Sequence, residues 1–197
     1  MSARPDDRRV QRTRRTLQKA LVALAFEKRF DAITVQDVLD RADVGRSTFY
    51  AHYRSKEDLF RSEFGQFLGY IRRGVAERGG RGERILPVRE LFDHVREARR
   101  LYRTMAGSAM RPELYRMAVT HIAAGVEEAL RARLRPRHEP PIPLPILANH
   151  LAVALLSMLD GWVTGGIPHP PERMDEIFHA LVMPGVRAAV GAAGDGS

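Results

Sequence analysis

The chain has 197 residues, enough for one large domain or two modest ones, and its hydrophobic content of 44% is ordinary for a globular protein. It contains no cysteine, which excludes disulfides, cysteine nucleophiles and thiolate metal sites. Its formal net charge of +8 favours a polyanionic partner, either nucleic acid or an acidic membrane surface.

Residues 1–10 form a basic segment with arginines at Arg4, Arg8 and Arg9. We expect a flexible arm, whose arginines suit DNA phosphates or a narrow minor groove, although a solvated charged tail has the same composition. The segment lacks the apolar stretch of a secretory signal, so we expect a cytoplasmic protein.

A first helix is predicted from the helical spacing of Leu17, Leu21 and Leu24, and it ends near Lys28. It opens a predicted DNA-binding domain over residues 11–57.

A second and a third helix are predicted between Thr34 and Tyr53, joined by a tight turn. Thr34 and Asp37 have the spacing of a capping box, which starts the second helix at Val35. Gly45 suits a left-handed or otherwise unusual turn conformation, and the third helix follows it near Arg46. This order of elements is typical of a helix-turn-helix.

A fourth helix is predicted to begin at Lys56, because Ser55 and Asp58 repeat the capping pattern. Its apolar stripe continues without a break to about Glu77, so the helix belongs to the predicted head and also to a second domain over residues 58–190.

Side chains on and around the third helix suit a DNA-binding surface. Arg46 can donate to a guanine edge, and the hydroxyls of Ser47 and Thr48 can meet bases or phosphates. The aromatic and basic residues that follow suit the phosphate backbone. The candidate DNA contacts are Thr34, Arg46, Ser47, Thr48, Tyr50, His52, Tyr53 and Lys56. Phe49 is expected to face inward. A generic amphipathic hairpin, with Tyr53 in its core and its polar residues merely solvated, is the alternative.

This region resembles the DNA-binding half of the TetR family of bacterial transcriptional regulators. The matching residues are Thr34, Val35, Asp37, Val38, Ala42, Val44, Ser47, Thr48, Tyr50, His52, Tyr53, Lys56, Glu57 and Leu59. The resemblance implies a three-helix DNA-binding head, a helical ligand-binding body, a homodimer and repression relieved by a small molecule. The chain departs from many members at the turn, where it has Asp43 before the valine and Gly45 after it.

Further helices are predicted beyond the head, with no strand pattern, so the fold class is all-α. They cover Leu86–Ala106, as two short helices meeting near Ala98, and then Glu113–Leu134, Ile146–Val163 and Pro171–Met183. Glycine- or proline-rich segments separate them at Gly79–Gly82, Arg135–Pro145 and Gly165–Pro170.

Residues 146–163 are apolar nearly all round, so a second apolar partner is expected. The resemblance implies a homodimer through 146–163 and 171–183, which would bind a near-palindromic operator; burial within one monomer is the alternative. The apolar run Leu151–Leu159 is far shorter than the roughly 20 residues that span a bilayer, so no membrane partner is expected.

The candidate ligand-binding residues combine apolar bulk with polar tips on the body helices, although most residues of this kind are plain core. They are Phe67, Tyr70, Phe92, Tyr102, Met105, Tyr115, His121, Met158 and Trp162.

Enzyme motifs are missing from the sequence, which has no G-x-S-x-G, no P-loop and no metal-ligand spacing among its scattered histidines. We therefore expect no enzyme, no metal and no cofactor. Two other classes stay open: an architectural DNA-binding protein without an effector, and a membrane-surface or ligand-carrier protein.

Overall fold

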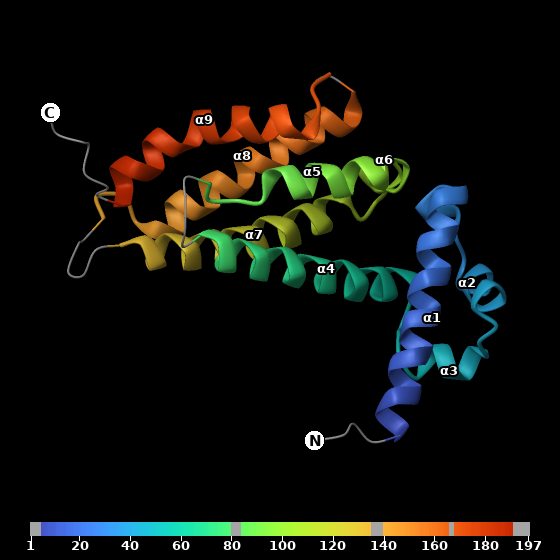
Figure 1. Ribbon diagram of the computed structural model, residues 1–197. Coiled ribbons are helices and arrows are strands. Elements are labelled where there is room, and N and C mark those ends of the chain that lie inside the picture. Colours follow the sequence, from blue (N-terminus) through green and yellow to red (C-terminus); the bar gives the residue numbers. More distant parts are fainter. Residues whose placement is uncertain (1–4, 80–83, 135–139, 166–167, 191–197) are drawn as a thin grey trace, which may run out of the picture. The chain divides into compact units, whose positions relative to one another are not determined.

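The computed structural model describes residues 5–79, 84–134, 140–165 and 168–190, and every regular element in these ranges is helical (Figure 1). The all-α prediction is confirmed for this part of the chain. The residues divide into two compact units. The head unit is Met1–Gln66 with Arg100–Leu114, and the body unit is Phe67–Arg99 with Tyr115–Ser197.

The head unit begins with the predicted series of helices. Its elements are α1 (Pro5–Glu27), the 3-10 turn η1 (Phe30–Ala32), α2 (Val35–Ala42), α3 (Arg46–Tyr50), the first part of α4 (Lys56–Gly79), most of α6 (Arg99–Ala106) and the start of α7 (Arg111–Arg133). The predicted first residues of α2 and α4 are both confirmed.

Helix α1 begins within the segment that was expected to be a flexible arm. Residues 5–10 are helical, and residues 1–4 lie outside the described ranges. The sequence between Asp6 and Glu27 contains neither glycine nor proline, and a proline is tolerated at the first helical position. The basic residues of this segment therefore continue one helical surface.

Phe49 is the centre of the head core, with 0% of its surface exposed. As predicted, it lies in one buried cluster with Leu17, Leu21, Leu24 and Val38. The short α3 is thereby held by its one buried side chain, since its other residues are exposed.

The head core extends beyond the predicted domain boundary at residue 57. Met105, Met110 and Leu114 belong to the same buried cluster as Phe49, and Leu101 packs against it. The sequence placed these residues in the body, because helical spacing does not show which core an apolar face joins. Met105 is therefore core of the head.

The body unit contains α5 (Val88–Glu97), α8 (Leu144–Thr164) and α9 (Pro171–Val190), with the later parts of α4 and α7. The predicted pair of short helices meeting near Ala98 is confirmed by α5 and α6. Helices α5, α8 and α9 contact one another, and Figure 1 shows α8 and α9 running beside α5. The predicted turn at Gly80 and Gly82 lies outside the described residues.

Helix α9 continues past Pro184, although the sequence predicted its end at Met183. Proline removes one backbone donor from a helix and clashes with the preceding turn, which usually ends it. Here Pro184 is exposed, while Met183, Val186 and Val190 are buried, so packing of the last turns outweighs this local cost.

Helix α8 has 21 residues, more than the nine-residue apolar run noted in the sequence, and by length and composition it is the one described helix that could cross a bilayer. Buried core helices of soluble proteins have the same properties. One side of α8 is buried in the body unit, through Leu147, Leu151, Leu155 and Leu159.

Candidate nucleic-acid interface

The start of α2 is fixed by the predicted capping box. The Asp37 amide donates to the Thr34 hydroxyl over 3.1 Å, and the Thr34 amide donates to the Asp37 carboxylate over 2.7 Å. The Lys28 ammonium lies 2.7 Å from the same carboxylate. Lys28 and Thr34 together hold the pKa of Asp37 far below its usual range. The Thr34 hydroxyl is thus engaged in the cap, although the residue is exposed.

The turn between α2 and α3 differs from the prediction. Asp43, not Gly45, has the left-handed conformation, with φ 50° and ψ 50°, while Gly45 is extended with φ −66° and ψ 149°. Aspartate is one of the few residues that tolerates this region besides glycine. Asp43 therefore takes the role for which the sequence favoured glycine, and the turn keeps its geometry.

Helix α3 presents a polar surface to solvent on the side away from the core. Arg46, Ser47 and Thr48 are exposed, and Tyr50 has 51% of its surface exposed. The Tyr50 ring meets the buried Phe49 ring edge to face, with centroids 5.3 Å apart. The structure thus brings four of the predicted DNA contacts together on one short helix.

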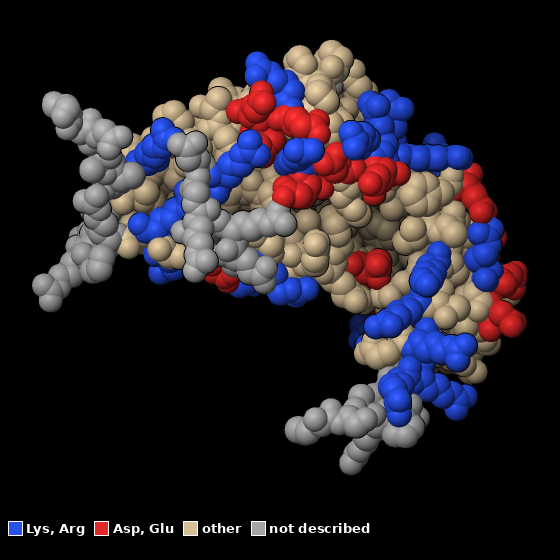
Figure 2. All heavy atoms as spheres, viewed as in Figure 1, with Lys and Arg blue, Asp and Glu red and all other residues tan. Residues whose placement is uncertain are grey.

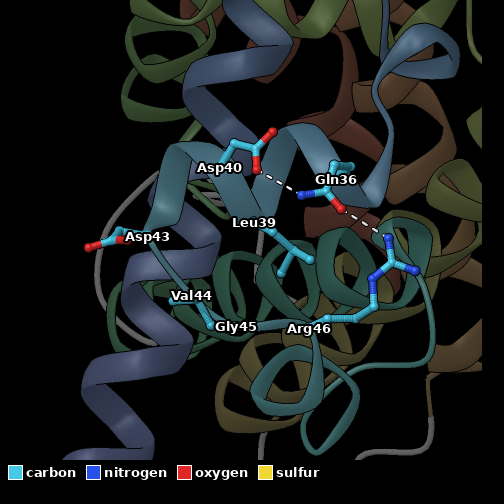
Figure 3. A pocket seen from close by; sticks show the side chains of 7 residues that line it. All are labelled: Gln36, Leu39, Asp40, Asp43, Val44, Gly45 and Arg46. Atoms are coloured by element: carbon cyan, nitrogen blue, oxygen red, sulfur yellow. Dashed lines mark hydrogen bonds between the residues drawn. The ribbon is translucent and has the colours of Figure 1, made fainter.

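Arg46 is held by Gln36 of α2, a residue that was not predicted from the sequence to belong to this surface. Its Nη2 donates to Gln36 Oε1 over 2.9 Å, and Gln36 Nε2 donates to Asp40 Oδ1 over 2.7 Å (Figure 3). These side chains border a hollow of about 500 Å³ that is also lined by Leu39, Asp43, Val44 and Gly45. The i, i+4 spacing of Gln36 and Asp40 is a signal that could have suggested their pairing.

The predicted contacts His52, Tyr53 and Lys56 are less exposed to solvent than the residues of α3. His52 is half-buried. Tyr53 is 5% exposed and belongs to the head core, and its burial raises the pKa of the phenol. This is the placement that the alternative reading gave to Tyr53.

Lys56 differs most from its predicted role at the phosphate backbone. Its ammonium donates to the carbonyl oxygens of Phe30, Asp31 and Ile33, at 2.9, 3.1 and 2.5 Å, and lies 5.0 Å from the Phe30 ring centroid. An ammonium has three donors, so all are used. With its side chain only 13% exposed, Lys56 joins the start of α4 to η1.

A basic surface covers the N-terminal half of α1. Figure 2 shows Lys and Arg side chains gathered over this part of the head unit. The exposed arginines there are Arg8, Arg9, Arg12, Arg14 and Arg15. Such a cluster is an electrostatic feature that attracts a polyanion.

The nine candidate ligand-binding residues are divided between the two units. Tyr102 and Met105 belong to the head unit, and the other seven belong to the body unit. Phe92 and Trp162 meet edge to face, with centroids 5.1 Å apart, and the indole donates to the His169 carbonyl over 2.8 Å.

The remaining candidates range from buried to open positions. Burial raises the pKa of Tyr102, and Phe67 stacks on His94 with centroids 4.6 Å apart. Tyr70 and Tyr115 are exposed, whereas His121 and Met158 are half-buried. Among the described residues no group of histidine, aspartate and glutamate is placed to hold a metal ion.

Two family models match the chain. Residues 17–62 match the bacterial regulatory proteins of the tetR family, and residues 87–184 match a transcriptional regulator C-terminal region. The uncharacterized HTH-type transcriptional regulator YxbF of Bacillus subtilis (strain 168) is 44% identical over 57 residues, which are 28% of this chain and 15% of that protein. The chain thus spans a small part of this relative's length.

Solved structures share the fold over most of their length. A TetR transcriptional regulator from Streptococcus agalactiae 2603V has a TM-score of 0.63 at 23% identity, covering 90% of this chain and 97% of that chain. The dihydroxyacetone kinase operon activator DhaS has a TM-score of 0.69 at 14% identity, covering 90% of this chain and 98% of that chain. The helix-turn-helix geometry and these matches indicate a DNA-binding regulator, and the chain belongs to the TetR family of transcriptional regulators.

Proposed function

We propose that the protein is a ligand-responsive repressor that binds a near-palindromic operator as a homodimer and is released by a small-molecule effector. The observation that carries the proposal is the surface of α3, where Arg46 and Tyr50 face solvent while Phe49 anchors the helix in the core. A guanidinium can donate to guanine O6 and N7, and a phenol can donate to a phosphate. In this proposal α3 lies in the major groove.

The proposed DNA contacts are Arg46, Ser47, Thr48, Tyr50 and His52, supported by the basic surface of α1. Thr34, as the cap of α2, lies where a helix start can face a phosphate. We assign Tyr53 and Lys56 to the structure of the head, because the first is buried and the second has its donors occupied.

The homodimer is proposed to form through α8 and α9. Large apolar side chains remain exposed on these helices, with Leu181 at 71% and Ile146 at 63%, and Val153 is also exposed. Large apolar side chains exposed on a pair of helices are typical of an interaction surface, and a twofold pair would bury them in an isologous interface. Such a dimer presents two α3 helices to successive major grooves.

The effector is proposed to bind in the body unit, among the seven candidate residues that belong to it. The chain passes between the two units at three places, after Gln66, Arg99 and Leu114. An effector needs about 1–3 kcal/mol of coupling to change operator affinity roughly 5- to 150-fold.

Selection of bound duplexes from a randomised DNA pool by the purified protein tests the proposal. We expect one enriched near-palindrome, with half-site centres about 34–36 Å apart or a multiple of it. Arg46→Ala should alter the preference among sequences, whereas Tyr50→Ala should weaken binding to all duplexes. Uniform losses from Arg46→Ala would contradict its base-reading role.

The same experiment discriminates the alternative, an architectural DNA-binding protein without an effector. That protein would enrich no sequence, and no small molecule would change its DNA affinity. The sign of regulation needs a reporter gene placed behind the selected operator, since one structural neighbour is an operon activator. Repression in this reporter, relieved by an effector found in a melting-shift screen, is the expected result. We propose a cytoplasmic location with no membrane partner.

A further inference from the structure

The hydrogen-bonded chain from Asp40 through Gln36 to Arg46 suggests how base discrimination is built into this head. All three residues are exposed, so the chain adds little to the stability of the fold. The hydrogen bonds act instead on the side chain of Arg46, because an unanchored arginine loses rotamer entropy when DNA binding fixes it.

We propose that Gln36 and Asp40 are positioning residues that hold the Arg46 guanidinium ready to read a guanine. This inference rests on the proposed binding of α3 to DNA. Gln36 accepts from Nη2 of Arg46 and thereby restrains its side chain. One of the five guanidinium donors is used, which leaves a pair on one edge for O6 and N7 of a guanine.

Asp40 determines which end of the Gln36 amide faces Arg46. A carboxylate only accepts hydrogen bonds, so the amide nitrogen must point to Asp40 and the amide oxygen to Arg46. Without Asp40, the Gln36 amide loses its second anchor, and only the hydrogen bond from Arg46 holds its oxygen in place. The hydrogen bonds therefore all point the same way: Arg46 donates to Gln36, and Gln36 donates to Asp40.

The two carboxylates on the hollow also matter for what Arg46 binds. Asp40 and Asp43 line the same hollow as Arg46 and give it negative charge, and the Asp43 carboxylate points away from Arg46 (Figure 3). A phosphate is disfavoured there by like charge, whereas a neutral base edge is not. Arg46 is thereby reserved for a sequence-dependent contact, and the hollow contributes specificity at the expense of general affinity.

The test measures the affinity of each variant for the selected operator and for copies with single base changes. Gln36→Leu, which keeps the size and removes both hydrogen bonds, should relax preference at the base pair relaxed by Arg46→Ala. Full loss of an arginine–guanine pair lowers discrimination by about 5- to 150-fold, and Gln36→Leu should lower it by at least about 3-fold. In the Arg46→Ala background Gln36→Leu should have no further effect, because the two act as one unit.

Asp40→Ala and Asp43→Asn form a matched pair, since each removes one carboxylate from the hollow. Both should raise affinity for random duplex by a similar factor, through the lost repulsion of phosphates. Only Asp40→Ala should also lower discrimination at the base pair assigned to Arg46. A loss of discrimination in Asp43→Asn as large as in Asp40→Ala would overturn the positioning role and leave charge alone as the cause.

Two further outcomes would overturn the inference while the proposed function stands. One is an unchanged base preference in Gln36→Leu. The other is relaxed preference at a different base pair, which would show that Gln36 contacts a base itself. If the wild-type protein selects no sequence, the proposed function fails, and this inference with it. A readout without DNA is the guanidinium nitrogen spectrum of Arg46, whose restricted rotation in the free wild-type protein should be lost in Gln36→Leu. Equal rotation in both proteins would also contradict the proposal.

Discussion

The Arg61 guanidinium faces the Glu113 carboxylate edge to edge, with Nε 2.6 Å from Oε1 and Nη2 3.2 Å from Oε2. Arg61 lies on α4 and Glu113 at the start of α7, so the pair joins two parts of the head unit that are 52 residues apart. Glu113 belongs to the head unit together with its neighbours Met110 and Leu114, whose side chains pack in the head core.

Replacing Glu113 by glutamine should lower the free energy of unfolding by no more than about 1 kcal/mol, because exposure of both side chains weakens the pair. Urea unfolding measures the change. Glu127→Gln is the matched control, since its partner Arg131 lies on the same helix and joins no distant segments. Equal losses in the two variants would show that the Arg61 pair adds nothing beyond a local surface contact.

Lys56→Met should destabilise the protein by about 1.5–3 kcal/mol, since three carbonyl oxygens lose a charged donor. The slope of log DNA affinity against log salt should not change, whereas loss of a phosphate contact would reduce it by about 0.9. Lys19→Met, at an exposed position of α1, removes the same charge and controls for its general effect. A reduced slope in Lys56→Met alone, with unaltered stability, would return Lys56 to the DNA contacts.

Local patterns in the sequence predicted those structural features that depend on residues close together in the chain. The starts of α2 and α4 were correct because a cap such as Thr34–Asp37 forms within three residues. The partners of Lys56 are 23 to 26 residues away, and no spacing in the sequence indicates them. The extension of α9 past Pro184 depends on burial by the rest of the body in the same way.

The turn between α2 and α3 shows that sequence-based prediction can also fail over a distance of three residues. The sequence indicated that one residue would need an unusual conformation, and glycine was the natural choice, but Asp43 has it. We therefore expect Asp43→Ala to lower the free energy of unfolding by about 1 kcal/mol, because alanine keeps the disfavoured Cβ and loses the short polar side chain that lets aspartate tolerate this region. Asp43→Gly should leave stability equal or higher.

Gly45→Ala is the matched variant for this turn. Gly45 has a negative φ, and a Cβ added there would meet nothing within 4 Å, so the unfolding midpoint should stay within error of the wild-type value. Thermal unfolding of the three variants checks both expectations. Greater damage from Gly45→Ala than from Asp43→Ala would contradict the observed turn.

The acid sensitivity of the head should depend on Asp37. Lys28 and Thr34 lower the pKa of this carboxyl in the folded state, so its contribution is complete above the unfolded pKa of about 4 and is lost as pH falls toward the folded pKa. Asp37→Asn should be less stable than the wild-type protein at neutral pH, and the difference should narrow on acidification below about pH 4. Urea unfolding at several pH values measures both proteins, and parallel curves would refute the linkage.

The proposed dimer should depend on the exposed apolar face of α9. Leu181→Asp places a charge in the proposed apolar contact, where it must be desolvated without a partner, so the variant should be monomeric at concentrations at which the wild-type protein is dimeric. Sedimentation equilibrium measures the mass. Because Leu181 is exposed in the monomer, the fold of each subunit should persist, with an unchanged helical circular dichroism spectrum.

The control for this variant is Tyr70→Asp, which adds the same charge at a similarly exposed apolar position on α4. It should leave the dimer intact, since α4 is outside the proposed interface. The monomeric Leu181→Asp protein should also lose most of its affinity for the two-half-site operator and keep a weak affinity for one half-site, because each head still folds. A Leu181→Asp protein that stays dimeric, or a Tyr70→Asp protein that dissociates, would place the interface on another surface and would require a different spacing between the two α3 helices.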